Sequence, residues 1–510
     1  MTMTPASLSA LLPLLPAALM LAALPRRGGA GERPAWRRLH WLGAAALTSA
    51  LAHLGLQLAA TPAHQATLPP GLGTTLPGAW VAVLVQLLGV VIAGFSSRYL
   101  QGEPGQPRYV AALAGVLAAV HVLLLADHWL LLIAAWAAVG VALQQLLCFY
   151  TDRPWALLAA HKKRLADRLA DALLLVAAAL AWADVGSGSL PALWRHLEAG
   201  APSAALQASA VCLALAVVLR TALLPVHGWM TQVMEAPTPV SALLHAGVVN
   251  LGGFVLIRFA PLLEAAPVAR GLLVALGLAT ALLASLVMLT RVSIKVRLAW
   301  STIAQMGFMV MECGLGLYTL ALLHLIGHSL YKAHAFLAAS TAVDETRLRA
   351  LRAPPRPSLA SLAMAPAGAG ALIAALVAAA PVAAWPWWWS GVLALAWAPL
   401  LWMPTSSQAG AAGAVRRAGA GGLMIAALTL AALLGHALPF GLSDAPHAAA
   451  GPLVLGGLTG LYLCLALLQV RPQALAGWRR WSYAGFYIDE FVTRASLRLW
   501  PTRWTATAAQ

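Results

Sequence analysis

The sequence has 510 residues, of which 61% are hydrophobic and only 9% are charged, and its formal net charge is +16. Soluble domains usually contain about 25% charged residues, so this composition excludes a soluble protein. It predicts an all-α polytopic membrane protein, because no segment shows the period-two alternation of a β-barrel.

Apolar runs near 20 residues in length predict about fifteen transmembrane helices. In chain order they cover residues 7–25, 40–60, 79–97, 109–126, 128–150, 168–184, 204–224, 239–260, 267–289, 296–313, 315–341, 359–380, 385–403, 422–438 and 452–470. The first run has no Ala-x-Ala cleavage pattern after a basic start, so we expect it to be a retained span. The four cysteines have no metal-ligand spacing and indicate neither disulfides nor thiol chemistry.

Lysine and arginine concentrate in the short loops that follow the odd-numbered spans, such as residues 26–38, 153–164, 291–297 and 347–356. The alternate loops are nearly free of them. The positive-inside rule therefore predicts an N-terminus outside and a C-terminus in the cytoplasm. Because the basic residues form no domain with interleaved aromatics, we expect lipid and not nucleic acid as the partner of this charge.

The segment after Val470 is too polar to span a membrane. Its aromatic residues predict an amphipathic cytoplasmic helix or strand-like segment that lies against the membrane or a partner. We expect the docking residues to be Tyr483, Phe486, Tyr487, Asp489, Glu490 and Phe491. No segment outside the spans is long enough for a soluble catalytic domain, so this chain is not expected to be an enzyme by itself.

Charged residues inside a bilayer cost several kcal/mol and are candidates for function. Arg168 and Asp171 begin the sixth span, and Arg220 lies about one turn before Pro225, which is expected to break the seventh helix. The alternatives are an interfacial charge network for the first pair and a snorkelling side chain for Arg220. His245 lies about one turn inside the eighth span, where an isolated histidine is often only hydrogen-bonded to a carbonyl.

The stretch "HLIGHSLYKAHAF" places His324, His328 and Lys332 four residues apart on one helical stripe. A metal site, a structural face and an ion path are the three interpretations. Two histidines beside a lysine make a poor zinc site, which needs a third ligand. Imidazole titrates near neutral pH, and neighbours at this spacing lie about 6 Å apart, so we favour a proton path. His334, about 200° round the helix from Lys332, is expected to lie off this stripe.

Three motifs, "APTPVSALLHAGVV", "IKVRLAWSTIAQMGFM" and "LHLIGHSLYKAHAFLAAS", resemble the antiporter-like subunits of respiratory complex I, Mrp-type antiporters and membrane-bound hydrogenases. This resemblance implies two inverted five-helix repeats with broken helices, at 109–260 and 261–403. These follow N-terminal helices at 1–108 and precede C-terminal helices at 404–470 and a tail at 471–510. The resemblance also implies a proton or cation path and residues between the halves: Lys332, His328, His324, Lys295 and His245, with Glu235 coupling the halves.

The sequence departs from that family at three positions. Ala137 replaces a glutamate of the fifth span, Arg220 replaces the lysine paired with it, and "APVAAWPWWWSG" lacks a lysine. A guanidinium does not release its proton in proteins. We therefore expect Arg220 to act as a fixed charge paired with Asp171 and not as a relay.

The segments "HKKRLADRLAD" and "YAGFYIDEFVTRASLRLWP", together with the absence of a long lateral helix, resemble the membrane subunit of DAB-type inorganic-carbon accumulation complexes. That resemblance implies a bacterial inner-membrane subunit whose large cytoplasmic partner contains zinc and is similar to carbonic anhydrase. It implies that protons or Na⁺ flowing down their gradient drive hydration of CO2 to bicarbonate by the partner, with no cofactor in this chain. The alternatives are an antiporter-like subunit of a complex I, hydrogenase or Mrp assembly, and a scaffold that conducts no ions.

Overall fold

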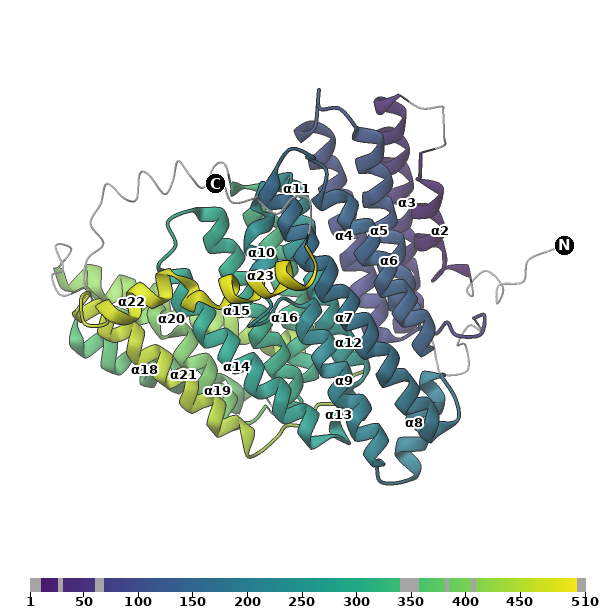
Figure 1. The fold of residues 1–510 in the computed structure, drawn as a ribbon. Helices are drawn as coiled ribbons and strands as arrows, with labels where there is room; N and C mark the ends of the chain where they lie inside the picture. The colour runs from purple at the N-terminus through teal and green to yellow at the C-terminus, as the bar shows by residue number, and fades with distance from the viewer. Residues whose placement is uncertain are drawn as a thin grey trace.

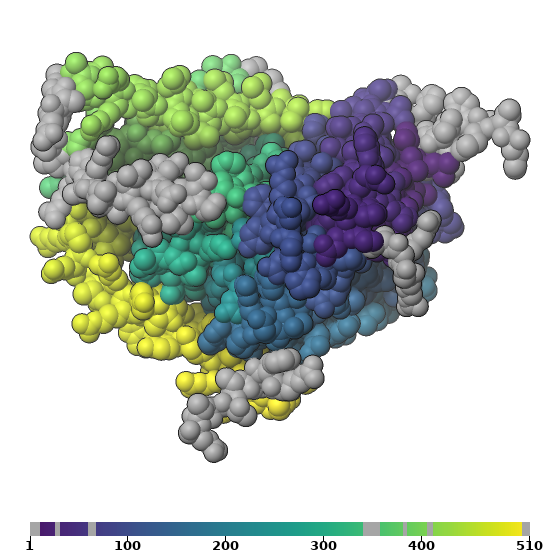
Figure 2. All heavy atoms as spheres, turned by 90° about the horizontal axis from the view of Figure 1, so that it is seen from above, coloured from purple at the N-terminus to yellow at the C-terminus, as the bar shows by residue number. Residues whose placement is uncertain are grey.

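The computed structural model describes residues 11–25, 31–59, 68–339, 357–380, 385–404 and 410–501. Every named element in these ranges is a helix, so the predicted all-α fold is confirmed for them. The helices form one bundle, with the N-terminal helices on one side, the C-terminal helices on the other and the tail running across it (Figure 1). Figure 2 shows the same order from above, from the N-terminal helices in purple to the C-terminal helices in green and yellow.

The first group of helices forms the N-terminal side of the bundle. Its members are α2 (Leu15–Ala22), α3 (Glu32–Ala59), α4 (Leu76–Tyr99), α5 (Gln106–Leu125) and α6 (Trp129–Leu147). The side chain of Thr75 caps α4 by accepting a hydrogen bond from the backbone N–H of Gly78 at 3.2 Å. The start of the first predicted span, before residue 11, lies outside the described residues.

The middle of the chain forms the centre of the bundle. Its elements are α7 (Pro154–Val185), α8 (Leu190–Ala199), α9 (Ala204–Arg220), α10 (Gly228–Gln232), η2 (Val233–Glu235), α11 (Thr238–Ala246), η3 (Val248–Asn250), α12 (Leu251–Arg258), α13 (Ala260–Glu264), α14 (Pro267–Leu289), α15 (Ile294–Leu315) and α16 (Tyr318–Leu337). The sequence did not predict α8, and α7 begins 14 residues before the predicted start at 168. The "HKKRLADRLAD" segment is therefore helical and not a loop, because Pro154 at N1 starts the helix at that point.

The C-terminal part adds a second layer and then the tail. Its elements are α18 (Leu359–Ala379), α19 (Trp387–Trp397), η4 (Ala398–Leu401), α20 (Gly410–His436), α21 (Ala450–Val470), α22 (Ala476–Tyr483), η5 (Gly485–Tyr487) and α23 (Ile488–Leu499). The backbone N–H of Ser358 donates to the carbonyl of Met403 at 2.7 Å, so α18 and α19 form an antiparallel hairpin. The tail is helical, so of the two predicted forms, an amphipathic helix and a strand-like segment, the helix is the one present.

Nine helices in the described ranges are long and apolar enough to cross a membrane, and α9 and the α19–η4 segment are shorter apolar helices. The predicted count of fifteen is higher because it includes short or polar spans, such as the part of α7 at 168–184, which carries Arg168, Asp171 and Asp184. The span formed by α11 and α12 is the most enclosed, with 94% of its most apolar stretch buried, against 11% for α21. The broken span is therefore central and α21 is peripheral.

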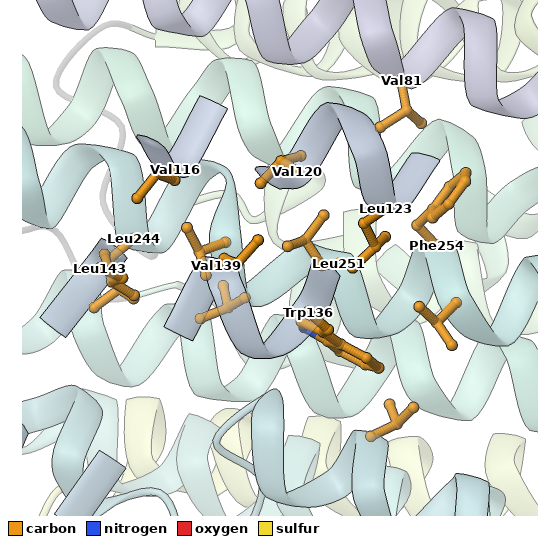
Figure 3. Packing of buried hydrophobic residues seen from close by; sticks show 14 of the residues in the cluster. Val81, Val116, Val120, Leu123, Trp136, Val139, Leu143, Leu244, Leu251 and Phe254 are labelled. Carbon is orange, nitrogen blue, oxygen red and sulfur yellow. The ribbon is translucent and has the colours of Figure 1, made fainter. Parts of the chain in front are cut away.

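The core is built where α4, α5 and α6 meet α11 and α12 (Figure 3). Val120 of α5, Val139 of α6 and Leu251 of α12 are all buried there. The backbones of α14 and α15 approach closely, because a Cβ atom added to Gly277 would lie 2.6 Å from the carbonyl oxygen of Gly307. Small residues at such a crossing let two backbones approach in a membrane.

Two central spans are interrupted. α9 ends at Arg220, and Ala222 follows in the left-handed region with a φ of 53° before Pro225, so the predicted break of the seventh span is present. The eighth span is interrupted between α11 and α12 by Gly247 and the 3-10 turn η3. α18, in contrast, runs without a break from Leu359 to Ala379.

Candidate functional site

The predicted stripe on α16 is mostly buried and faces α15. The Lys332 side chain is 1% exposed, and its Nζ donates to the carbonyl of Leu298 at 3.1 Å and to the hydroxyl of Ser301. The rings of His324 and His328 lie one turn apart with centroids separated by 5.9 Å. The stripe therefore has three titratable side chains along one helix face, while His334 is exposed, as its place on the helix predicts.

The stripe has a fourth member that the sequence analysis did not single out. Glu312 of α15 is 3% exposed, and its Oε2 lies 2.7 Å from Nδ1 of His324. A carboxylate in an apolar span is a signal that the sequence carries. Its partner could not be predicted, because the contact depends on the turn that folds α15 back against α16. We call Glu312, His324, His328 and Lys332 the relay row.

Exchanging Glu312 for glutamine should reduce ion flux by about a hundredfold if the row carries protons. Glutamine keeps an oxygen acceptor for His324 but no longer takes up a proton, so the free energy of unfolding should fall by only about 1 kcal/mol. Flux in proteoliposomes and thermal unfolding measure the two effects. The matched control is Glu264→Gln at the exposed end of α13, which should leave both unchanged; equal flux in the two variants would exclude Glu312 from the path.

The row lies against polar groups of the broken eighth span. Nδ2 of Asn250 donates to the hydroxyl of Ser329 at 2.7 Å, which joins this span to α16 beside His328. The ring of His245 stacks on Phe336, with centroids 4.4 Å apart, and neither of its ring nitrogens has a hydrogen-bond partner among the described residues. Lys295 lies at the start of α15, where Nζ donates to the Thr238 hydroxyl at 2.9 Å.

Several buried polar atoms along this interface have no hydrogen-bond partner among the described residues. Buried atoms without a hydrogen-bond partner in the described part of the chain include Nε2 of His328, both ring nitrogens of His245, Oγ of Ser241 and Oδ1 of Asn250. Most buried polar groups in proteins are hydrogen-bonded, and an unsatisfied one is costly. These atoms lie on α11, η3 and α16, along the predicted ion path, and their role in it stays a prediction.

In the first half, the structure brings Arg220 against Asp171. A guanidinium nitrogen of Arg220 donates to the Asp171 carboxylate and another donates to the Trp136 carbonyl at 3.0 Å. The guanidinium carbon also lies 4.6 Å from the centroid of the Trp136 ring. Arg168 is a peripheral third member, since its side chain is 64% exposed and lies 3.5 Å from Asp171. Ala137, at the position where the sequence resemblance implies a glutamate in the family, lines a small cavity beside this pair.

Glu235 contacts the start of α7. Its Oε2 accepts a hydrogen bond from the backbone N–H of Ala156 at 3.3 Å, and its carbonyl accepts one from Arg153 at 2.8 Å. Both contacts are at the first turn of α7, where the helix dipole favours a negative charge. The structure thus shows Glu235 as a cap of α7, and its role between the halves stays a prediction.

The tail folds back onto its own bundle. Lys162 of α7 is 4% exposed, and its Nζ lies 2.5 Å from Oδ1 of Asp489 and 2.7 Å from the hydroxyl of Thr493. The second oxygen of Asp489 accepts a hydrogen bond from Gln232 of α10 at 2.9 Å. Burial lowers the pKa of Lys162, although the charge of Asp489 acts to raise it. A Cβ atom added to Gly228 would collide with the Asp489 carboxylate, so the tail lies directly over the segment that follows the break of the seventh span.

The predicted docking residues divide into two sets. Asp489 faces the bundle, and Phe486 packs against its core. Tyr483, Tyr487, Glu490 and Phe491 are exposed, with Phe491 the most open at 75%. The helices that carry them, α22, η5 and α23, run across the bundle (Figure 1), and the centroid of the Tyr483 ring also lies 5.7 Å from the guanidinium carbon of Arg291. Partner docking by these residues stays a prediction.

We expect Asp489→Asn to loosen the tail, because it removes the charge that partners the buried Lys162 ammonium. Loss of one hydrogen bond to a charged group costs about 2 kcal/mol, a roughly thirtyfold increase in the detached population. The rate of tryptic cleavage after the exposed Arg494 reports that population. Glu490→Gln removes an exposed charge from the same helix and is the control; equal cleavage rates in the two variants would contradict the contact.

No group of three or more His, Cys, Asp and Glu side chains in the described ranges is placed to hold a metal. The relay row offers two imidazoles one turn apart on α16 and one carboxylate from α15, and Lys332 one turn further along α16 would repel a cation. The expectation that this chain has no cofactor stays a prediction.

Comparison with known proteins defines the class to which this fold and row of residues belong. The family model described as NADH:quinone oxidoreductase/Mrp antiporter, TM, matches residues 126–396, which is more than half of the chain and includes the whole relay row. The chain therefore belongs to this family of antiporter-like membrane subunits.

Individual relatives narrow the comparison to one group of proteins within the family. The probable inorganic carbon transporter subunit DabB of Hydrogenovibrio crunogenus is 36% identical over 446 residues, which is 84% of this chain and 85% of the relative. The probable inorganic carbon transporter subunit DabB2 of Halothiobacillus neapolitanus is 41% identical over 347 residues, which is 65% of this chain and 63% of the relative. The predicted resemblance to DAB-type membrane subunits is confirmed. NADH-ubiquinone oxidoreductase chain 5 of Metridium senile is 34% identical over 272 residues, or 52% of this chain and 45% of that one.

Solved structures support the fold. A chain of the Mrp complex from Dietzia sp. DQ12-45-1b matches with a TM-score of 0.60 and 23% identity, over 96% of this chain and 60% of that chain. A chain of the membrane-bound sulfane sulfur reductase, an archaeal respiratory membrane complex, matches with a TM-score of 0.58 and 17% identity, over 96% of this chain and 99% of that chain. At these identities the likeness shows the shared fold alone.

Proposed function

We propose that this chain is the cation-conducting membrane subunit of an inorganic-carbon uptake complex in a bacterial inner membrane. The observation that carries the proposal is the buried relay row, in a chain whose relatives are named inorganic carbon transporter subunits. Protons, or Na⁺ in their place, pass down their gradient through the second half of the bundle. This flow drives accumulation of bicarbonate by a partner.

The residues of the row suit stepwise proton transfer. Glu312 and His324 are in direct hydrogen-bond contact, and His324 and His328 are close enough for one water molecule to bridge their rings. Imidazole gains and loses a proton near neutral pH, and a desolvated lysine can also do so. His245 extends the row toward the broken central span, and Lys295 extends it toward the start of α15, next to the loop that carries Arg291.

The first half of the bundle is proposed to hold charge without relaying it. Arg220 keeps its proton, and its contact with Asp171 leaves that carboxylate paired. Ala137 removes a further titratable group. Conduction of ions down their gradient through one half needs fewer proton-transferring groups than pumping against the gradient through two halves. This supports a subunit that conducts ions downhill and does not pump them.

The chemistry of carbon uptake is proposed for the partner. A large cytoplasmic zinc protein similar to carbonic anhydrase would hydrate CO2 with water to bicarbonate and a proton, and this chain would supply the cation flow that makes hydration one-way. The exposed residues Tyr487, Glu490 and Phe491 of the tail are the proposed docking surface. We also infer the inverted repeats at 109–260 and 261–403, with the N-terminus outside and the C-terminus in the cytoplasm.

Purification of the tagged chain from its native membrane, with metal analysis and a CO2-hydration assay, tests the proposal. One large soluble partner with stoichiometric zinc supports it. Several homologous membrane subunits in the complex would instead support the second candidate, an antiporter-like subunit of a respiratory or Mrp assembly, which the family model and the NADH-ubiquinone oxidoreductase relative favour.

A further inference from the structure

A deep cleft on the outside of the bundle takes no part in the relay row. It has a volume of about 980 Å³ and lies between α14, α21 and the tail helix α22. Most of its length is lined by leucines of α14 and α21, among them Leu286, Leu461 and Leu465. These are spans at the edge of the bundle, so the cleft has the apolar character of the bilayer interior.

The end of the cleft beside α22 is polar. Ser482 is 4% exposed and lines the cleft, and its hydroxyl has no hydrogen-bond partner among the described residues. Arg479 lines the same end and is exposed, and no ion pair joins it to an acidic side chain in the described ranges. No aspartate or glutamate lines the cleft, so its polar end is cationic.

The backbone of α21 leaves room for an occupant. A Cβ atom added to Gly460, which lines the cleft, would meet nothing within 4 Å. The polar end lies where α14 and α21 meet the loops that carry Arg291 and Arg471. Basic pockets between transmembrane helices at such an end bind the head groups of anionic lipids.

We propose that this cleft binds one anionic phospholipid. Its acyl chain lies along the leucines of α14 and α21, and its phosphate accepts hydrogen bonds from the Arg479 guanidinium and the Ser482 hydroxyl. The two-part lining matches an amphiphile with a long apolar tail and a negative head. Inorganic phosphate would leave the apolar length unused, and a neutral lipid would leave Arg479 without a counter-ion.

The site has a consequence for the tail. α22 packs on α14 and closes the polar end of the cleft, so a bound phospholipid would fasten α22 to the bundle through its phosphate. Asp489 fastens the other tail helix to Lys162. The lipid would therefore be the second attachment of the tail.

Native mass spectrometry of the full chain, delipidated in detergent and titrated with phosphatidylglycerol, tests the proposal. The unaltered chain should retain one phosphatidylglycerol, and Gly460→Leu should lose it because leucine fills the cleft. Arg479→Gln should weaken binding by about fivefold, the effect of one charge near a lipid phosphate. The matched controls are Gly456→Leu, on the same helix with equal open space, and Arg480→Gln, next in the chain; neither residue lines the cleft, and both should bind as the unaltered chain does.

Three results would overturn the proposal. They are equal retention of phosphatidylglycerol in Arg479→Gln and the unaltered chain, equal affinity for phosphatidylcholine, and displacement of the lipid by millimolar inorganic phosphate. Arg479 is exposed, so its variant should fold even if Gly460→Leu does not, and thermal unfolding of each variant without lipid checks this.

Discussion

Lys332→Met should reduce ion flux and carbon-dependent growth by about a hundredfold, the usual contribution of a proton-transferring group. Methionine fills nearly the same volume, so packing should be kept while the ammonium contact with Ser301 and the Leu298 carbonyl is lost. The measurement is proton flux into proteoliposomes under an imposed gradient, with growth at ambient CO2 as the second readout.

His334→Ala is the matched control for Lys332→Met, because His334 lies on the same helix but is exposed and off the relay row. It should retain full flux. If Lys332→Met and His334→Ala conduct equally, α16 is not the ion path, and the subunit is better described as a scaffold for its partner.

Asp171→Asn should produce the largest loss of stability. Removing one partner of a buried ion pair costs about 3–5 kcal/mol, because the other charge stays buried without compensation. The side chains of Arg220 and Asp171 are only 4% and 13% exposed, so solvent screens the pair weakly. Thermal unfolding of the purified chain measures the effect, and Arg168→Gln, which removes the exposed neighbour, should change the melting temperature little.

A double-mutant cycle measures whether Arg220 and Asp171 stabilise the fold through their interaction with each other. If Arg220 and Asp171 interact, Arg220→Gln with Asp171→Asn should cost much less than the sum of the two single losses. Additive losses would show that each residue acts alone. Arg220→Lys should be tolerated if only its charge matters, whereas a loss of uptake would show that the two-pronged contact with Asp171 and Trp136 is required.

The sequence alone predicted the elements that depend on local composition. Apolar runs located the spans, Pro225 located the break after α9, and the four-residue spacing of His324, His328 and Lys332 placed them on one helix face. These features follow from hydropathy and helical periodicity, which are properties of contiguous residues.

Features that depend on contacts between distant segments were not predicted. Glu312 meets His324 only because α15 and α16 pack as a pair, and Asp489 meets Lys162 across 327 positions of sequence. The tail was expected to face a partner or the membrane, but two of its six predicted docking residues, Phe486 and Asp489, face the bundle. The cleft beside Ser482 forms where α14, α21 and α22 meet, so it could not be predicted from the sequence of any one of these helices.

The tail contacts a segment close to the broken seventh span. Asp489 lies over Gly228 and Gln232, in the segment that follows the break at Arg220. The helix on which we propose that the partner docks therefore also contacts the centre of the bundle.

The most direct test of the central claim is inorganic-carbon accumulation by proteoliposomes that contain the intact complex, under an imposed proton or sodium gradient. Accumulation should follow one of the two gradients, stop when an ionophore collapses it, and be lost in Lys332→Met but kept in His334→Ala. Accumulation that continues without any cation gradient, or that is unaffected by Lys332→Met, would contradict the account.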